Sequence, residues 1–285
     1  MIIVKVWGGI GNQLFQYVFG QYLRYRYNQE VYYDNNSFIS TDHLRKPELY
    51  ALDAEIKYDN RCSFSKTRGV KNRILRFMFQ MHPKHHYIAE ESPIPQNYNA
   101  DHVYFFQGYW QDIKYFEWLQ SYVPYFTIRL QEWPNELVEI RKQIVSIENS
   151  VSIHIRRGDY FKPENIKIFG VCDAAYYEKG IKVVTENDPN AKMFVFSDDL
   201  QWVKDNLHLP EDAIYVPNYE VSQFAYIELM SLCKDHIISN SSFSWWGAVL
   251  NAHKGSNVIC PNKWTLTSDS TIALNNWKRI QDYDK

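Results

Sequence analysis

The sequence lacks the features that define several classes of protein. It has no run of roughly 18 apolar residues, the length that a membrane-spanning helix needs. The apolar run at residues 1–7 is too short for a signal peptide, so we expect none. The four cysteines lie far apart without a CxxC pair. They therefore predict reduced, mostly buried thiols of a cytoplasmic protein rather than a disulfide framework or a zinc site.

Charge of one sign and low-complexity sequence are also missing. The formal net charge is −2, which does not favour a surface that binds nucleic acid. Glycine and proline number 11 each among 285 residues, and hydrophobic residues make up 45%, so the composition is that of a folded chain. Aromatic residues reach 16%. Such rings line sugar-binding clefts, but they also fill cores and interfaces.

The order of the expected elements predicts an α/β fold. Two strands open the chain with a glycine turn and a helix between them, whereas residues 37–100 show no clear pattern. From residue 151 onward strands and helices alternate, as in a parallel sheet with right-handed crossovers. The expected strands are 2–7, 30–33, 102–106, 151–156, 192–197, 213–216, 236–239 and 257–260, and the expected helices lie near 11–27, 134–148, 174–187, 199–206, 221–234 and 242–253. We expect two Rossmann-like domains that face a cleft, formed by residues 1–140 and 141–285.

The motif GGIGNQ at residues 8–13 occupies the position of a phosphate-binding turn, between the first strand and the first helix. The free N–H groups and the dipole at a helix N-terminus attract anions. The motif is not a GxGxxG fingerprint, because Leu14 stands where the last glycine belongs, and it lacks the GK[ST] of a Walker A loop. The glycines either contact a phosphate or only allow a tight turn.

Polar residues end the strand that begins at Val151. Period-2 alternation puts His154 and Arg156 on one face and Arg157 on the other. Ligands of open parallel sheets bind outside the carboxyl ends of the strands. An arginine there can hold a diphosphate and stabilise the charge on a leaving group, and Asp159 can brace the arginine or bind a hydroxyl. The alternative is a surface turn with an ion pair and a satisfied histidine.

Two later segments repeat this arrangement of a strand followed by polar residues. Asp198 and Asp199 follow the strand at 192–197 and begin a helix, so we favour an N-cap role for one and a hydrogen bond to a nucleotide for the other, over a metal site. The serine-rich turn at 240–244 can donate hydrogen bonds to a phosphate at a helix start. Glu228 either reaches a base or ribose or is an ordinary helix residue, and the tryptophans at 245 and 246 favour core packing.

Residues 61–89 contain no aspartate or glutamate. They contain the cations Arg61, Lys66, Arg68, Lys71, Arg73, Arg76 and Lys84, with apolar residues at 74, 75, 77, 78 and 81 between them. This basic amphipathic segment predicts either peripheral contact with the anionic inner surface of a membrane or a solvated face beside an anionic substrate cleft.

Four segments in order resemble the α1,2-fucosyltransferases of glycosyltransferase family 11. They are GGIGNQLFQY at 8–17, HIRRGDY at 154–160, FSDD at 196–199 and ISNSSFSWWGA at 238–248. The HxRRGD core is also similar to that of the α1,6- and protein O-fucosyltransferases. The resemblance covers nearly the whole chain, and four ordered motifs are far more specific than any one of them.

The resemblance implies a two-domain GT-B fold that binds the acceptor mainly in the N-terminal half and the donor mainly in the C-terminal half. It implies an inverting transfer of L-fucose from GDP-β-L-fucose to the 2-hydroxyl of a terminal galactoside, without a catalytic metal and without a cofactor, since GDP-fucose is a substrate. The implied acceptor is a galactose-terminated oligosaccharide or a lipid-linked glycan.

The same resemblance implies roles for individual residues. Arg156, Asp159 and His154 are the expected catalytic residues, with Arg156 neutralising the departing phosphate and Asp159 holding the arginine turn; the general base stays unassigned. The expected donor-binding residues are Gly9, Gly11, Asn12, Gln13, Arg157, Asp198, Asp199, Glu228, Asn240, Ser241, Ser242, Phe243 and Ser244. The alternatives are a fucosyltransferase of different linkage or acceptor and a non-catalytic glycan- or nucleotide-binding module.

Overall fold

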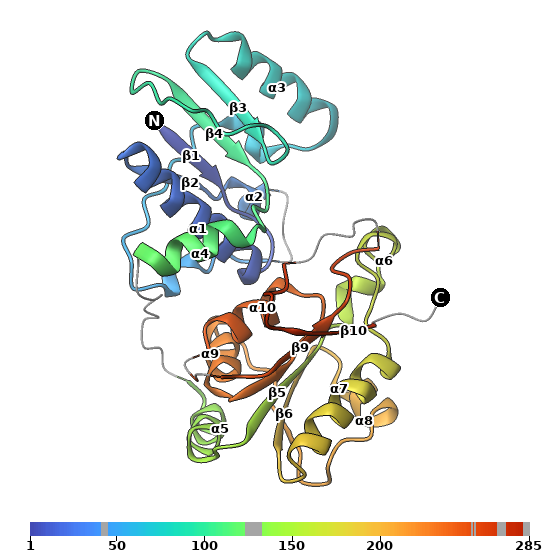
Figure 1. The fold of residues 1–285 in the computed structure, drawn as a ribbon. Coiled ribbons are helices and arrows are strands. Elements are labelled where there is room, and N and C mark those ends of the chain that lie inside the picture. The colour runs from blue at the N-terminus through green and yellow to red at the C-terminus, as the bar shows by residue number, and fades with distance from the viewer. Residues whose placement is uncertain (41–44, 123–132, 252, 254, 267–271, 282–285) are drawn as a thin grey trace. The chain divides into compact units, whose positions relative to one another are not determined.

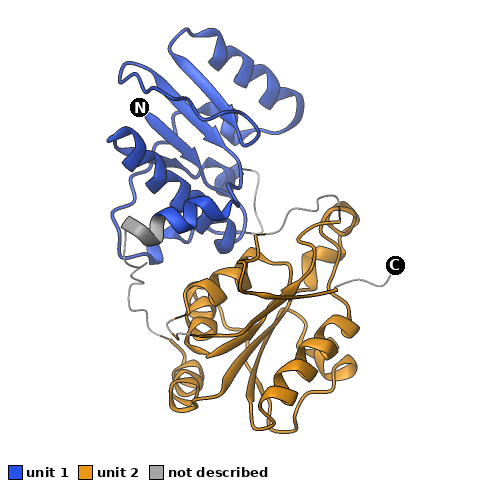
Figure 2. Ribbon diagram, in the orientation of Figure 1, with its two compact units in different colours: residues 1–130 blue, residues 131–285 orange. Residues whose placement is uncertain are grey.

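The computed structural model describes residues 1–40, 45–122, 133–251, 253, 255–266 and 272–281 (Figure 1). The chain forms two compact units, Met1–Leu130 and Gln131–Lys285 (Figure 2). Each unit carries its own parallel sheet, so the predicted α/β fold with two parallel sheets is confirmed. The assignment of an acceptor side and a donor side to the two halves of the chain stays a prediction.

Unit 1 is built on a parallel sheet with the strand order β2-β1-β4-β3. Its strands are β1 (Ile2–Lys5), β2 (Val31–Asp34), β3 (His85–Ala89) and β4 (Val103–Gln107). Its helices are α1 (Ile10–Tyr27), α2 (Asn36–Ser40), α3 (Gly69–Met81) and α4 (Ile113–Tyr122), with 3₁₀ turns at Leu49–Ala51 and Ser63–Lys66. The apolar run that begins β1 is fully buried, as is typical of a central strand covered on both faces.

Helix α1 approaches the sheet of unit 1 closely at Gly20. A Cβ atom at this position would lie 2.3 Å from the hydroxyl oxygen of Tyr33 on β2. That hydroxyl donates to the carbonyl of Tyr17 and accepts from Nε2 of Gln21, both at 3.1 Å. Glycine in a helix costs about 1 kcal/mol relative to alanine. The close packing of α1 on Tyr33 explains why a glycine stands here.

Unit 2 is built on a parallel sheet with the order β10-β9-β8-β5-β6-β7. Its strands are β5 (Ser150–Ile155), β6 (Lys192–Ser197), β7 (Ile214–Tyr215), β8 (Asp235–Ile237), β9 (Val258–Pro261) and β10 (Lys278–Ile280). Its helices are α5 (Asn135–Ser146), α6 (Pro163–Phe169), α7 (Ala174–Asn187), α8 (Leu200–Asn206), α9 (Phe224–Leu232) and α10 (Ser242–Val249), with a 3₁₀ turn at Gly158–Phe161. Buried side chains of β5 and β6 pack with those of α7 and α8 in one core cluster.

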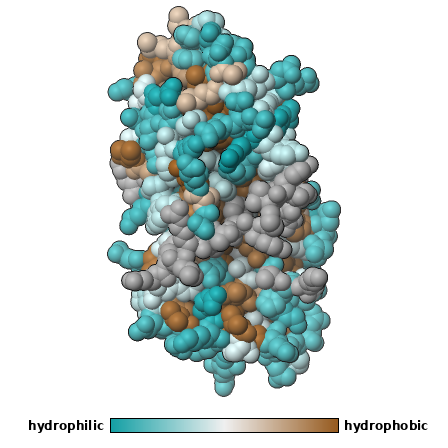
Figure 3. Space-filling view, turned by 90° about the vertical axis from the view of Figure 1, so that its left-hand side faces the viewer, coloured by the Kyte–Doolittle hydropathy of each residue, from teal (hydrophilic) through white to brown (hydrophobic). Residues whose placement is uncertain are grey.

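The expected strands and helices all have counterparts in the structure, although residue 252, at the end of one expected helix, lies outside the described residues. The sequence pattern did not reveal α2, α3, β3, α4, α6 or β10. All four cysteines are free and buried, and Trp245 and Trp246 are fully buried, as predicted. In the described part of the chain no helix is long and apolar enough to cross a membrane. Hydrophilic side chains cover most of the face in Figure 3, between scattered hydrophobic patches.

Candidate active site

The polar motifs of unit 2 gather where its sheet changes direction. The chain runs from β5 outward to β6 and β7, then returns to place β8 on the other side of β5. This reversal makes the C-terminal ends of β5 and β8 a topological switch point, the place where open α/β sheets bind ligands. The HIRRGD and SDD segments include the C-terminal ends of β5 and β6 and the residues after them, and SNSSFS follows β8; these three strands are adjacent and parallel. The sheet therefore brings together three motifs that are far apart in the sequence.

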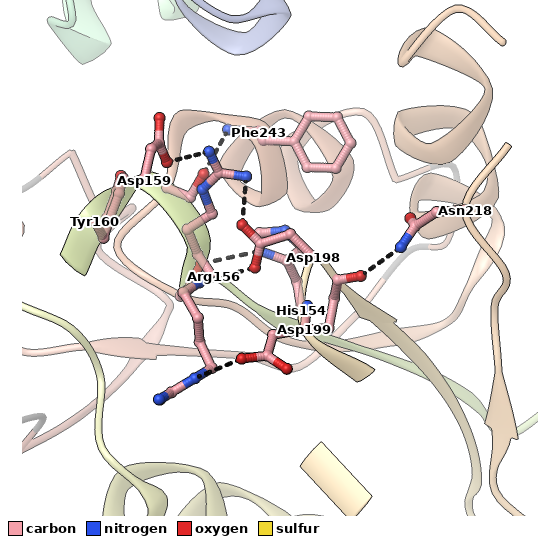
Figure 4. A network of polar contacts seen from close by, with 12 residues as sticks. His154, Arg156, Asp159, Tyr160, Asp198, Asp199, Asn218 and Phe243 are labelled. Atoms are coloured by element: carbon pink, nitrogen blue, oxygen red, sulfur yellow. Dashed lines mark hydrogen bonds and ion pairs between the residues drawn. The ribbon is translucent and has the colours of Figure 1, made fainter. Parts of the chain in front are cut away.

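Arg156 is the centre of the polar network at this edge (Figure 4). Its Nη1 lies 2.8 Å from Oδ2 of Asp198, and its Nη2 donates to Oδ1 of Asp159. The ring of Tyr160 lies 5.6 Å from the guanidinium carbon, and the hydroxyl of Tyr160 donates to the carbonyl of Asn240 at 3.0 Å. The side chain of Arg156 is 21% exposed. A half-buried guanidinium is thus held by carboxylates on two sides and remains accessible to a ligand.

Arg157 lies on the opposite side of the strand end, against α8. Its guanidinium stacks on the ring of Trp202 at 3.7 Å, and the ring of Phe161 lies 4.6 Å away. Its Nε is buried and lies 3.4 Å from Oδ2 of Asp199, an ion pair without hydrogen-bond geometry. Asp199 also caps α8 by accepting from the backbone N–H of Trp202 at 3.1 Å. The predicted N-cap role of one aspartate of the pair is thereby confirmed, and Arg157 is locked by packing.

Asp198 links the two arginines, and Gly158 gives it the room to do so. One carboxylate oxygen contacts Arg156, and the other accepts from the backbone N–H of Arg157 at 2.9 Å. A Cβ atom at Gly158 would lie 2.5 Å from Oδ2 of Asp198. The glycine of the RRGD motif therefore has a steric reason, because any side chain there would displace the carboxylate from Arg156.

His154 connects β5 to the segment that follows β8, across the switch point. Its Nδ1 lies 2.9 Å from Oγ of Ser239, which follows β8, and its ring lies 5.3 Å from that of Phe243. Burial, together with the nearby cation of Arg156, lowers the pKa of His154 to about 3. The imidazole is consequently neutral at physiological pH and can offer or accept a hydrogen bond without carrying a charge.

The serine-rich turn forms the start of α10. Ser241 caps the helix by accepting from the N–H of Phe243 at 3.3 Å, and Ser244 is buried with its hydroxyl 3.3 Å from the carbonyl of Ser241. Ser242 and Phe243 are only half-buried. The amide of Asn240 donates to the carbonyl of Phe169 at 2.8 Å and is buried. The polar side chains of Asn240, Ser241 and Ser244 therefore build the turn, while Ser242 and Phe243 remain partly accessible.

Glu228 stands apart from the Arg156 network among the described contacts. It lies on α9 with its side chain 26% exposed, and its Oε1 accepts from Nε of Arg141 at 3.1 Å. Because Arg141 is on α5, the pair joins two helices of unit 2. A contact between Glu228 and a nucleotide would therefore have to compete with this ion pair.

The glycine motif of unit 1 lies at the C-terminal end of β1. Gly9 is the N-cap residue of α1, and Gly11 is buried in its first turn. The amide of Gln13 is buried; its Nε2 donates to the carbonyls of Gly8 at 2.9 Å and Lys46 at 2.8 Å, and its Oε1 accepts from the N–H of residue 48. Asn12 accepts from Nε2 of Gln111 at 2.8 Å. The contacts of Gln13 within unit 1 hold the chain near residue 47.

Unit 1 has a switch point of its own, which the sequence pattern did not reveal. The order β2-β1-β4-β3 puts it between β1 and β4. At the C-terminal ends of these strands the rings of Trp7 and Tyr109 lie 5.0 Å apart, and Nζ of Lys5 lies 3.5 Å from Oε1 of Gln107. Nζ of Lys5 also lies 5.3 Å from the ring of Trp7, and burial lowers the pKa of this lysine. Partly exposed rings beside polar groups form a surface suited to a sugar.

No metal-binding cluster can be built from the residues that the structure describes, since no three His, Cys, Asp or Glu side chains gather in a suitable arrangement. Asp159, Asp198 and Asp199 are each engaged with an arginine.

Solved structures with the same arrangement of elements are GT-B fucosyltransferases. The crystal structure of the fucosyltransferase NodZ from Bradyrhizobium matches 87% of this chain and 92% of its own, with a TM-score of 0.51 at 12% identity. A structure of NodZ, an α-1,6-fucosyltransferase, soaked with GDP-fucose matches 87% and 91% of the two chains, with a TM-score of 0.50 at 14% identity. At this level of identity the match defines the fold, which is that of the GT-B glycosyltransferases.

The chain belongs to glycosyl transferase family 11, whose model matches residues 62–281. It is 32% identical to an alpha-1,2-colitosyltransferase of Escherichia coli over 93% of this chain and 92% of the relative. It is 29% identical to the O-antigen biosynthesis glycosyltransferase WbnK of Escherichia coli over 95% of this chain and 97% of the relative. The protein is thus an enzyme of this glycosyltransferase family, as its four motifs predicted.

Proposed function

We propose that the enzyme transfers L-fucose from GDP-β-L-fucose to the 2-hydroxyl of a terminal galactoside, with inversion and without a metal ion. The observation that carries this proposal is Arg156, held by Asp159 and Asp198 at the switch point of the unit 2 sheet. A guanidinium has five N–H donors in a planar fork, so it can contact two carboxylates and still donate to a diphosphate. The α-1,2 linkage in the name of one relative supports the choice of hydroxyl.

The proposed mechanism is a single in-line displacement. The acceptor oxygen bonds to the anomeric carbon while the bond from that carbon to GDP breaks, and the electron pair leaves with the β-phosphate. Arg156 neutralises the growing charge on this phosphate, the role that a divalent cation plays in other transferases. Asp159 and Asp198 hold the guanidinium in position before the donor arrives.

We do not assign His154 as the base that removes the proton of the acceptor hydroxyl. An imidazole with a pKa near 3 is a weak base at neutral pH, so we give His154 a positioning role between β5 and the start of α10. Asp159 already accepts from Arg156. Stabilisation of the leaving group accounts for most of the rate in this scheme, with the proton passing to solvent or to a group of the acceptor side.

We further propose that the acceptor sugar binds at the switch point of unit 1. The half-exposed rings of Trp7 and Tyr109 supply an apolar platform, and Lys5 and Gln107 supply hydrogen bonds to sugar hydroxyls. Tyr109→Ala should raise KM for the acceptor more than it lowers kcat, because it removes a binding surface that is used equally in ground and transition states. Tyr50→Ala, at another exposed tyrosine of unit 1, is the matched control.

The deciding experiment incubates the purified protein with GDP-fucose and lactose or N-acetyllactosamine, with and without excess EDTA. We expect fucosylated product in both cases and a loss of about 10²- to 10³-fold in kcat for Arg156→Ala. Arg279→Ala, which removes an exposed arginine on the edge strand β10, should retain full activity. Linkage analysis of the product tests the 1,2 assignment, and product that disappears with EDTA would overturn the metal-free mechanism.

A colitosyl donor is the second candidate, because one relative is named for colitosyl transfer. Competition between GDP-fucose and GDP-activated colitose at equal concentration separates the two. If colitose is transferred faster, the donor assignment changes while the roles of Arg156 and its carboxylates stand. Binding of GDP without any transfer would support a non-catalytic module instead.

A further inference from the structure

Helix α3 presents a row of apolar side chains to solvent. The row consists of Val70, Ile74, Phe77, Met78 and Met81, which we name the α3 ridge, and each of these residues is between 55% and 70% exposed. At 3.6 residues per turn the five positions fall within an arc of about 100° on one side of the helix. No residue of α3 is buried. A contiguous apolar surface of this kind on a folded protein marks a place of interaction.

The opposite side of α3 anchors the helix to unit 1. Leu75 and Phe79 pack against the core cluster that contains Phe64 and Phe105. The guanidinium of Arg76 lies 4.7 Å from the ring of Tyr87 on β3. Figure 1 shows α3 at the outer edge of unit 1, alongside β3. The orientation of the ridge is therefore fixed by packing on its far side.

Cations flank the ridge on both sides. By the same helical geometry Lys71 lies about 20° beyond one edge of the arc and Arg73 about 40° beyond the other. The structure records no hydrogen bond or ion pair for these two side chains within the described residues. Residues 61–89 contain seven cations and no aspartate or glutamate, so no acidic side chain of this segment offsets the positive charge around the ridge.

We propose that the α3 ridge is a docking surface for an anionic phospholipid bilayer. The helix lies in the plane of the interface, the five apolar side chains enter the boundary between headgroups and acyl chains, and the flanking cations contact phosphate and carboxylate headgroups. The charge decides between a bilayer and a second copy of the chain. Two ridges facing each other would bring like charges together, whereas an anionic lipid surface complements both the apolar row and its cationic borders.

The test is sedimentation of the full chain with lipid vesicles, without donor or acceptor. We expect binding to vesicles that contain phosphatidylglycerol and little binding to pure phosphatidylcholine, with release as salt concentration rises. The double variant Phe77→Ser/Met81→Ser should bind at least tenfold more weakly, and Lys71→Gln/Arg73→Gln should weaken binding by on the order of tenfold. Because these side chains are exposed, the variants leave the core of unit 1 intact.

Matched controls come from α5 of unit 2, where Val145 is an exposed apolar residue and Lys142 an exposed cation. Val145→Ser and Lys142→Gln should leave vesicle binding unchanged. Equal binding to neutral and anionic vesicles, or no binding to either, overturns the proposal. Sedimentation velocity of the lipid-free chain provides the other arm: a dimer that Phe77→Ser/Met81→Ser converts to a monomer would assign the ridge to a second copy instead. None of these readouts depends on the sugar that the enzyme transfers.

Discussion

Gly158→Ala should disable the arginine site by a sub-ångström displacement. The added Cβ would lie 2.5 Å from Oδ2 of Asp198, so the carboxylate has to retreat by about 0.9 Å to reach an ordinary contact. That oxygen is 2.8 Å from Nη1 of Arg156, and the other carboxylate oxygen accepts from the N–H of Arg157 at 2.9 Å. The retreat breaks the first of these contacts and bends the second.

The expected loss follows from the strength of one charge-assisted hydrogen bond. Such a bond contributes about 1.5–3 kcal/mol, and each 1.36 kcal/mol is a factor of ten in rate. If Arg156 needs Asp198 for its orientation, kcat/KM for the donor should fall by about 10- to 100-fold. The assay is steady-state release of GDP, with a thermal melt of each variant to verify folding.

A double-mutant cycle tests the stated cause. The same Cβ would lie 4.0 Å from Cβ of Asp198, an ordinary contact, so Gly158→Ala fits once the carboxylate is gone. In an Asp198→Ala background, Gly158→Ala should therefore have almost no further effect on kcat/KM. A further tenfold loss in that background would refute the steric reasoning, and full activity of Gly158→Ala alone would refute the need for the carboxylate.

Three further predictions concern stability. The buried imidazoles of His154 and His236 have pKa values of about 3 against 6.5 unfolded, so the unfolded chain binds more protons below pH 6.5. Between pH 6.5 and 5 the two should remove about 3 kcal/mol from the free energy of unfolding, measured by urea titration at both pH values. Asp34 has the opposite pH dependence, because burial raises the pKa of its carboxyl from 3.8 to about 6 and the stability that the protonated carboxyl contributes is lost as pH rises through that range. As pH rises from 4 to 7, the free energy of unfolding of Asp34→Asn should therefore rise by up to about 3 kcal/mol relative to that of the parent protein in the same titration. Gly20→Ala should destabilise the fold by about 1–3 kcal/mol, because its Cβ meets the hydroxyl of Tyr33, and a thermal melt would detect this loss.

The sequence could predict the polar motifs of unit 2 because each one is local. A buried strand followed by RRGD, SDD or SNSSFS is a pattern within about ten residues, and parallel strands bring their carboxyl ends to one edge of a sheet. The sequence predicted the N-cap role of one aspartate, but it could not predict the use of polar groups whose partners are distant in the chain. The amide of Gln13 holds the chain near residue 47, and the amide of Asn240 holds the carbonyl of Phe169. Both depend on segments that are distant in the chain.

The sequence predicted the basic amphipathic segment at 61–89, but it did not predict which of its apolar side chains face solvent, nor the pair of rings at the switch point of unit 1. The pair formed by Trp7 and Tyr109 exists only because β4 lies beside β1, a pairing between strands about a hundred residues apart. In α3 the ridge residues and the packed residues Leu75 and Phe79 are all apolar, so the sequence alone does not tell which side faces the sheet. The strand β3, HHYIA, sits at an edge and has only one buried residue, which removes the apolar run that identified β1.

The balance of charge around Arg156 bears on the proposed role of this arginine in binding a diphosphate. Arg156 and Arg157 face Asp159, Asp198 and Asp199, so the five side chains carry a formal excess of one negative charge. An arginine without these partners would be mobile, and ordering its side chain on binding would cost up to about 2 kcal/mol. The carboxylates remove that cost in advance but repel the incoming phosphate. The planar fork of the guanidinium reconciles the two demands, because its N–H groups point in different directions and only some of them are used by the carboxylates.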